Sequence, residues 1–230
     1  MKEINEKSTL GEIVANDFRA ANVFKQAGLD FCCGGNKTID IACREKSIDQ
    51  SAVLMELAAL EQQPVQPGQN FSEWDPGFLA DYIVNTHHKY VLKTLPDLEF
   101  YTRKIADVHG NNHKELIEIA GLISQVASEL RQHLKMEEEV LFPAIKRLTH
   151  KITDEDRSLA KSEILRMKGE HEFAGGAMDK INEITNHYSV PADGCNTYNV
   201  TFRLLEQFED DLHIHVHLEN NILYPKTLNL

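Results

Sequence analysis

Apolar residues recur at spacings of three and four along four long segments of the chain. The segments cover residues 77–108, 113–148, 155–188 and 197–222. This spacing puts the apolar side chains on one face of an α-helix, so each segment is expected to form a helix with one buried stripe. Turn-forming sequences separate the segments, and no strand-like alternation occurs. The pattern predicts an all-α protein containing an antiparallel four-helix bundle.

Two prolines interrupt these helical patterns. Pro96 lies within the first segment, and Pro143 lies near the end of the second. Because proline lacks a backbone N–H, a kink or an early stop is expected at each position.

The first 60 residues predict several short helices in place of the long helices of the bundle. STLGEIVANDFRAANVFKQAG begins with a capping box, Thr9 with Glu12, and ends at Gly28, which predicts one helix. Further helices are expected to begin near Thr38 and near Ser47 or Asp49. The polar, proline-rich stretch EQQPVQPGQNFSEWDPG cannot continue a helix. We therefore expect a small helical domain (1–62), a linker (63–76) and the bundle (77–230).

Composition and charge limit the kinds of binding partner and the cellular compartment that can be expected. In 230 residues, 24 Lys and Arg face 36 Asp and Glu, for a formal net charge of −12, which repels nucleic acid and anionic membranes. Neither a signal-peptide core nor an apolar run long enough to span a membrane is found. Four cysteines, two of them adjacent, form a poor disulfide framework. We expect a cytoplasmic protein with reduced thiols and no nucleic acid or membrane partner.

One sequence motif occurs twice in the chain, as HLKMEEEVLFP and as HVHLENNILYP. The first segment likewise carries HKY where the third carries HEF, at nearly the same interval, which indicates a duplicated helical hairpin. The predicted buried stripes each turn one histidine inward, and two of them also turn in a glutamate. These inward polar residues are His88, His133, Glu137, His171, His215 and Glu219.

Six such donors in an apolar core would cost several kcal/mol per ionised group unless cations compensated for the lost hydration. The spacing of four residues puts His133 and Glu137 on one helix face, and His215 and Glu219 on another. Four histidines divide two per ion, and the two glutamates can bridge both ions. Nitrogen and oxygen donors without thiolate favour two iron ions, with manganese or zinc as alternatives. The remaining histidines are assigned to helix ends, turns or other helix faces, and none to metal: His87, His109, His113, His150, His187, His213 and His217.

The adjacent cysteines Cys32 and Cys33 lie in GLDFCCGGN. A disulfide between neighbours is strained and labile, so these residues are candidate thiols for redox or transfer chemistry. Gly34 and Gly35 would let backbone N–H groups approach the sulfurs and favour thiolate. The simpler alternative is two small residues filling a turn. Cys43 and Cys195 are expected to be bystanders.

The paired HxxxE motifs resemble those of hemerythrin-like domains, and their combination with DFCCGG resembles the RIC family, the di-iron proteins for repair of iron-sulfur clusters. The resemblance covers essentially the whole chain. It implies a hemerythrin-like bundle with a carboxylate-bridged di-iron centre, with an oxo or hydroxo bridge as one option. It also implies damaged iron-sulfur proteins as partners after nitrosative or oxidative stress, and reaction with nitric oxide. The implied ligands are the same six residues, with Cys32 and Cys33 as the paired thiols.

The chain departs from oxygen-carrying hemerythrins at two positions. Gly175 stands where they have a further histidine, and the last motif has Glu219 four residues after its histidine, with Asn220 where they have aspartate. One histidine fewer leaves both irons open, which suits an iron donor or a nitric-oxide-reactive centre. Gly175 and Gly176 leave room for a small-molecule channel or for a close helix contact.

Several alternatives stay open at this point. One is a hemerythrin-like protein that binds or senses oxygen or nitric oxide; a ferritin-like oxidase and a purely structural bundle are less favoured. Whether the protein turns over as an enzyme stays open. Its oligomeric state also stays open, with a homodimer as one option.

Overall fold

A computed structural model of the chain describes residues 4–61 and 70–230, and within them it contains helices and a single β-bridge, between Thr9 and Thr38. The small N-terminal helices are α1 (Leu10–Asn16), α2 (Ala20–Gln26), α3 (Ile39–Lys46) and α4 (Gln50–Glu61). The bundle consists of α5 (Pro76–Ile83), α6 (Lys89–His109), α7 (Glu115–Met136), α8 (Phe142–His150), α9 (Asp154–Ile184), α10 (Asn196–His217) and α11 (Tyr224–Leu228). The all-α prediction is confirmed.

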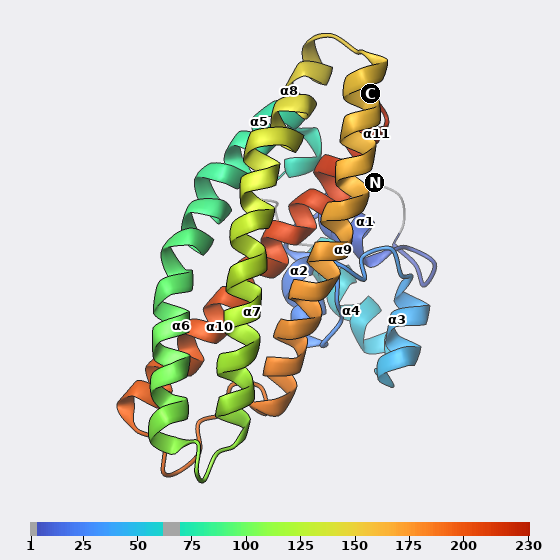
Figure 1. Ribbon diagram of the computed structural model, residues 1–230. Helices are drawn as coiled ribbons and strands as arrows, with labels where there is room; N and C mark the ends of the chain where they lie inside the picture. The colour runs from blue at the N-terminus through green and yellow to red at the C-terminus, as the bar shows by residue number, and fades with distance from the viewer. Residues whose placement is uncertain (1–3, 62–69) are drawn as a thin grey trace.

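Four long helices, α6, α7, α9 and α10, run side by side in an antiparallel bundle (Figure 1). Each helix packs against two neighbours, in the cyclic order α6, α7, α9, α10. The helices α1 to α4 lie together on one side of the bundle, beside α9 (Figure 1). Their apolar side chains join one continuous core with those of the bundle. Within residues 4–61 and 70–230, no helix is both long and apolar enough to cross a bilayer.

Capping residues set several helix ends as the sequence predicts. Thr9 accepts a hydrogen bond from the backbone N–H of Glu12, and Thr38 accepts one from Ile41. Gly28 has a φ of 67°, the left-handed conformation that ends α2. Asp49 accepts a hydrogen bond from the N–H of Ser51 at the start of α4. Local side-chain chemistry therefore defines these boundaries.

The first N-terminal helix is divided, which corrects the expectation of one continuous helix up to Gly28. Asp17 takes an extended conformation after α1, and its carboxylate accepts hydrogen bonds from the backbone N–H and the guanidinium of Arg19. This local side-chain bonding replaces the helical hydrogen bonds and separates α1 from α2.

Part of the segment predicted as a linker is structured. Its first part, residues 62–69, lies outside the described residues. Phe71–Glu73 forms a 3₁₀ turn, and the Phe71 ring is buried against Phe18 and Trp74, at centroid distances of 5.5 and 4.8 Å. The prolines and glycines of this segment indicated a linker, but its aromatic residues pack into the core.

Neither proline stops its helix. α6 continues through Pro96, and Pro143 occupies the first turn of α8, where a missing N–H costs nothing. The third bundle helix is shorter than expected. It ends at Ile184, and Asn186, His187 and Tyr188 all have positive φ.

Candidate metal centre

The six predicted donors form one buried layer across the bundle. Each is at most 3% exposed to solvent. One apolar cluster, containing Leu134 and Ala174, packs on one side of the layer, and a second, containing Leu141 and Met167, packs on the other. The layer is therefore enclosed by apolar side chains and shielded from bulk water.

Three of the donors lie in short π-helical segments that the sequence analysis did not predict. These segments are Val84–His88, Glu137–Leu141 and Leu218–Leu223, and they contain His88, Glu137 and Glu219. A π turn inserts one residue into an α-helix without breaking the chain direction. Each segment thus joins two α-helices of one bundle rod while it presents a donor to the centre.

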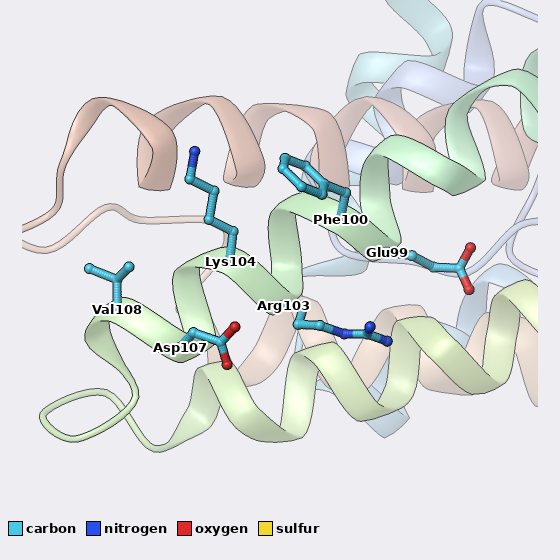
Figure 2. A pocket seen from close by; sticks show the side chains of 6 residues that line it. All are labelled: Glu99, Phe100, Arg103, Lys104, Asp107 and Val108. Atoms are coloured by element: carbon cyan, nitrogen blue, oxygen red, sulfur yellow. The ribbon is translucent and has the colours of Figure 1, made fainter.

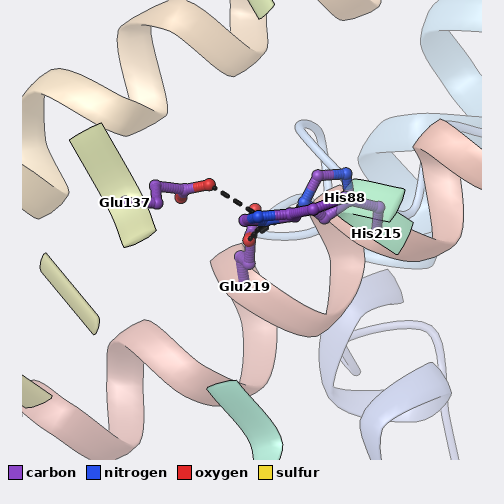
Figure 3. A group of neighbouring side chains, drawn as sticks. All are labelled: His88, Glu137, His215 and Glu219. Atoms are coloured by element: carbon purple, nitrogen blue, oxygen red, sulfur yellow. Dashed lines mark hydrogen bonds and ion pairs between the residues drawn. The ribbon is translucent and has the colours of Figure 1, made fainter. Parts of the chain in front are cut away.

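The donors form two groups that share both glutamates. One group is His88, Glu137, His215 and Glu219 (Figure 3), and the other is His133, Glu137, His171 and Glu219. In the first, Nε2 of His88 lies 3.4 Å from Glu137 and Nε2 of His215 lies 3.0 Å from Glu219. In the second, the corresponding distances are 3.3 Å from His133 to Glu137 and 3.1 Å from His171 to Glu219. Two neighbouring ions could therefore each have two imidazoles and be bridged by both carboxylates.

The spacing of the donor atoms fits a transition metal ion. The Nε2 atoms of His133 and His171 face each other at 3.0 Å. Two nitrogens bound to one ion at about 2.1 Å with a right angle between them lie about 3.0 Å apart. Without an ion, one nitrogen must carry a proton for this contact to be favourable.

The negative charges of the two buried glutamates also require positive charge at the centre. Burial lowers the pKa of His88, but the neighbouring carboxylates of Glu137 and Glu219 outweigh burial and raise the pKa to about 10. Burial and the Glu219 charge raise the pKa of Glu137, but His133 and His88 outweigh them and lower it to about 2. The carboxylates therefore need positive charge beside them, which protons on imidazoles or bound metal ions can supply.

Four atoms of the six donor residues lack a hydrogen-bond partner in the part of the chain that the structure describes: His88 Nε2, Glu137 Oε2, Glu219 Oε2 and His215 Nδ1. The imidazole nitrogens around these oxygens approach closely but without hydrogen-bond geometry. Buried polar atoms are normally paired, and an unpaired one points to a missing water or ion. The donor set and the unpaired atoms thus fit a pair of first-row transition ions.

Three polar residues on neighbouring helices hold the imidazoles in orientation. Glu138 lies 2.8 Å from Nδ1 of His88, Glu170 lies 2.7 Å from Nδ1 of His133, and Asn220 lies 3.0 Å from Nδ1 of His171. An acceptor at Nδ1 favours the tautomer whose Nε2 is free to bind metal. The sequence did not predict these contacts, although each of the three residues is the direct neighbour of a predicted donor.

The acceptors follow the repeat, apart from one position. Glu138 and Asn220 each follow a central glutamate and each contact the histidine of the preceding helix rod. Glu170 precedes His171, and the equivalent residue before His88 is His87. Instead of accepting a hydrogen bond from His215, the His87 ring stacks on it at 5.6 Å.

The repeated aromatic residues also take equivalent positions. Phe142 stacks on His88 at 5.5 Å, and Tyr224 stacks on His171 at 6.1 Å. Only Tyr224 has a hydroxyl, which donates to Oε1 of Glu137 at 2.6 Å. This hydrogen bond occupies one oxygen of Glu137 and leaves the other directed toward the imidazoles.

Two further histidines are buried, so the prediction of one inward histidine per helix is wrong. His87 is 3% exposed and its Nδ1 lies 2.9 Å from Asp211, while His217 is fully buried and its Nδ1 lies 3.1 Å from Asn221. Burial lowers the pKa of His217 to about 4, which keeps that ring neutral. Neither belongs to the two donor groups. His87 lies within the π segment Val84–His88, where a stripe traced at α-helical spacing shifts by one residue, and His217 is covered by the Phe31 ring at a centroid distance of 5.7 Å.

The vicinal cysteines lie against the bundle, close to a donor helix. The thiol of Cys33 donates to the backbone carbonyl of His171 at 3.5 Å, and a Cβ added at Gly175 would lie 3.2 Å from the same sulfur. Of the two roles expected for Gly175, the structure supports close packing, with a thiol as the neighbour.

The expectation that the Cys32 sulfur favours the thiolate form is wrong. Its hydrogen bond with Cys33, its burial and the nearby Asp30 carboxylate raise its pKa well above the ordinary value. The Gly34 N–H donates to Asp30 at 2.7 Å, so it does not serve the sulfurs. Cys32 is therefore held as a thiol.

Asn221 joins the cysteine loop to the end of the bundle. Its side-chain amide donates to the backbone carbonyls of Phe31 and Cys32, both at 3.1 Å. A Cβ at Gly35 would lie 2.6 Å from both the Asn221 side chain and the Phe31 carbonyl. Glycine is therefore required here by close approach of a neighbouring chain segment.

We expect Gly35→Ala to destabilise the protein by about 1–3 kcal/mol, because the added methyl group overlaps a backbone oxygen that cannot move aside freely. Chemical denaturation of the full chain measures this change. The matched control is Gly176→Ala in α9, where no atom lies within 4 Å of the added Cβ, among the described residues. That variant should be neutral or up to about 1 kcal/mol more stable. Equal stability of the two variants would contradict the packing at Gly35.

Cys195 is exposed and lies apart from the centre, at the start of α10. Nε2 of His109 lies 3.3 Å from its sulfur, and this hydrogen bond lowers the pKa of Cys195 to about 7. This local activation was not expected from the sequence, which marked Cys195 as a bystander.

We expect iodoacetamide to alkylate Cys195 at pH 7 at least about tenfold faster than Cys32, because the thiolate is the reactive form. The rate at Cys195 should rise as pH passes 7 and level off above 8. Peptide mapping by mass spectrometry over time measures both rates. His109→Ala should slow the reaction at pH 7 and move the rise in rate to higher pH, and an unchanged pH profile would contradict the role of His109.

A surface hollow of about 620 Å³ lies on the C-terminal half of α6 (Figure 2). Its lining residues are Glu99, Phe100, Arg103, Lys104, Asp107 and Val108. None of them is one of the six donors, so this hollow is separate from the centre.

A duplicated four-helix bundle with a buried layer of four imidazoles and two shared carboxylates defines a hemerythrin-type cation-binding protein. Comparison with family models agrees, because residues 79–227 match the hemerythrin HHE cation binding domain. Residues 6–61 match a domain of unknown function, DUF542.

Full-length relatives give the narrower family. The chain is 31% identical to a probable iron-sulfur cluster repair protein of Haemophilus influenzae, over 96% of each chain. It is also 31% identical to iron-sulfur cluster repair protein ScdA of Staphylococcus haemolyticus, over 97% of this chain and 99% of the relative. Iron-sulfur cluster repair protein YtfE of Yersinia pseudotuberculosis is 31% identical over 96% of each chain. This chain belongs to the family of iron-sulfur cluster repair proteins.

Proposed function

We propose that this protein repairs iron-sulfur clusters damaged by oxidative or nitrosative stress, and that its bundle centre holds two iron ions. One observation carries the proposal: two buried donor groups share Glu137 and Glu219 and leave polar atoms of both carboxylates unpaired. Relatives over nearly the full length bear the name of this function. The partners would be damaged iron-sulfur proteins of the cytoplasm.

His88 and His215 would hold one ion, His133 and His171 the other, and both glutamates would bridge them. When bound, the iron pair would supply iron for a damaged cluster and a redox centre reactive with nitric oxide or oxygen. The side chains around the centre orient its ligands and exclude water. The acceptors at Nδ1 orient three imidazoles, the apolar clusters exclude water, and Tyr224 fixes the rotation of the Glu137 carboxylate.

Cys32 and Cys33 are proposed to assist the transfer of electrons or of iron. Closing a disulfide between two thiols releases two electrons and two protons, and the pair lies beside the backbone of His171. Because Cys32 is held as a thiol, its reaction would require a change at the loop that exposes or deprotonates it.

Recovery of a damaged enzyme tests the proposal. An iron-sulfur enzyme inactivated by peroxide or nitric oxide is incubated anaerobically with the iron-loaded protein, and its activity is followed over time. Recovery should exceed that given by the same amount of free ferrous iron. Equal recovery with free iron would reject the proposal.

The cysteine role has its own test within the same assay. Cys32→Ser should keep its iron but lose most of the recovery, whereas Cys195→Ser, at the exposed thiol, should match the wild type. Full recovery with Cys32→Ser would reject the role of the thiols and leave iron donation standing.

A second candidate function is binding or sensing of oxygen or nitric oxide. Asn221 favours it, because this residue lies two positions after Glu219 and holds the N-terminal loop through Phe31 and Cys32. A change at the centre could thereby reach the N-terminal helices. Reversible binding of one gas molecule per centre without loss of iron would support this function over repair.

A further inference from the structure

A third cluster of metal-binding side chains lies outside the donor layer, between α9 and α10. It consists of Asp179 on α9 with Glu209 and His213 on α10. One donor atom from each lies within 4.8 Å of the others. Glu209 and His213 are four residues apart, so they occupy the same face of α10. Neither glutamate of the central layer contributes here.

Glu209 separates this cluster from an ordinary exposed acidic patch. Its side chain is only 4% exposed, and burial raises its pKa. Oε2 accepts a hydrogen bond from the Asn182 amide at 2.9 Å, but Oε1 has no hydrogen-bond partner in the described part of the chain. A buried carboxylate oxygen left unpaired loses its hydration without compensation and is therefore unfavourable. A cation at the cluster would remove this cost.

Tyr188 is the competing neighbour of Glu209. Its hydroxyl is buried, and burial and the Glu209 carboxylate both raise its pKa. Within residues 4–61 and 70–230, however, it forms no hydrogen bond of acceptable geometry. The phenol therefore does not satisfy Oε1, and a carboxylate oxygen keeps lone pairs for a metal in either case.

The donor types and distances fit a small divalent cation. One imidazole and two carboxylates without thiolate suit manganese, ferrous iron or zinc. Donor atoms that bind one ion at about 2.1 Å lie at most about 4.2 Å apart, so a modest rotation of exposed Asp179 would close the site. A metal here would compensate two carboxylates, and Asp30 adds further negative charge near Asp179.

The site is open to solvent on one side, unlike the central layer. Asp179 is exposed and His213 is half-buried. His213 also lines a cavity of about 530 Å³ between α10 and the N-terminal helices, together with Phe31, which immediately precedes the vicinal cysteines. Water can complete the coordination, so a bound ion would exchange readily.

We propose that Asp179, Glu209 and His213 form a mononuclear binding site for an exchangeable first-row divalent cation, separate from the bundle centre. The site goes beyond the proposed repair function and does not depend on it. Its position beside the cavity under the cysteine loop gives an incoming or departing ion a protein ligand set outside the closed bundle.

Manganese binding to the iron-loaded full-length protein tests the proposal. Bound Mn²⁺ is counted from the loss of the free-ion electron paramagnetic resonance signal, and iron is measured in the same samples. The wild type should bind one Mn²⁺ per chain while it retains its iron. The bound ion should show coupling to one imidazole nitrogen, which His213→Asn should abolish.

Asp179→Asn should weaken Mn²⁺ binding at least about tenfold, and Glu209→Gln should weaken it further. Glu206→Gln, an exposed acid on the same helix, is the matched control and should bind as the wild type. Because Asp179 is exposed, its variant should fold even if Glu209→Gln does not. Absence of Mn²⁺ binding by the wild type, or equal binding by Asp179→Asn and Glu206→Gln, would overturn the proposal.

Discussion

Replacing Glu219 with alanine is expected to remove both metal ions from the bundle centre. The carboxylate of Glu219 belongs to both donor groups, with Nε2 of His215 at 3.0 Å and Nε2 of His171 at 3.1 Å. Its loss would take a proposed ligand from each ion and half of the carboxylate charge at the centre. After anaerobic loading with ferrous iron, bound metal should fall from about two ions per chain to fewer than one.

Metal analysis and Mössbauer spectra measure the loss of the pair in this variant. Glu219→Gln keeps the volume of the side chain, so it separates loss of charge from damage to the packed core. The matched control is Glu139→Ala, which removes an exposed carboxylate two residues after Glu137. That variant should keep both ions. Retention of a spectroscopic iron pair in Glu219→Ala would show that the pair does not depend on Glu219.

The candidate donors were accessible to sequence analysis because burial and spacing act locally. His133 with Glu137, and His215 with Glu219, fall on apolar stripes four residues apart, and the structure buries all of them in one layer. The duplication then implied that the two halves face each other. Their role as metal ligands stays a proposal, as does the division into domains at residues 1–62 and 77–230.

The π segments were not predictable from the same pattern. Glu137–Leu141 and Leu218–Leu223 consist of residue types that equally form an α-helix, and only the fit of the surrounding bundle selects the wider turn. Pro143 and Pro225 follow these segments and supply no N–H to the helical ladder. The extra residue in Val84–His88 also explains why His87 is buried although a stripe at α-helical spacing excludes it, whereas His217 is buried by contact with Phe31.

Contacts between residues that lie far apart in the sequence were also not predictable. The pairing of Glu170 with His133, and of Asn221 with Phe31 and Cys32, depends on how separate helices dock. No local spacing encodes such docking. The raised pKa of Cys32 has the same origin, because it depends on burial and on the side chains of Cys33 and Asp30.

The two metal positions are expected to differ in stability, and the ion held by His88 and His215 should leave first. At the other position both imidazoles have a polar partner at Nδ1, Glu170 at 2.7 Å and Asn220 at 3.0 Å. Nδ1 of His215 has no such partner among the residues described. Loss of one such partner typically weakens metal binding about 10–100-fold.

Chelation of ferrous iron under anaerobic conditions should therefore show two phases of equal amplitude, with rates that differ by about 10–100-fold. Glu170→Ala removes the partner of His133, so the slow phase should accelerate toward the fast one. Glu172→Ala, an exposed acid one residue beyond His171, is the matched control and should leave both phases unchanged. A single phase in the wild type would contradict the inequality. A slow phase unaffected by Glu170→Ala would show that the acceptor at Nδ1 does not set it. If both expectations hold, the departure from symmetry at His87 releases one iron while the other stays bound, as a donor of single iron ions requires.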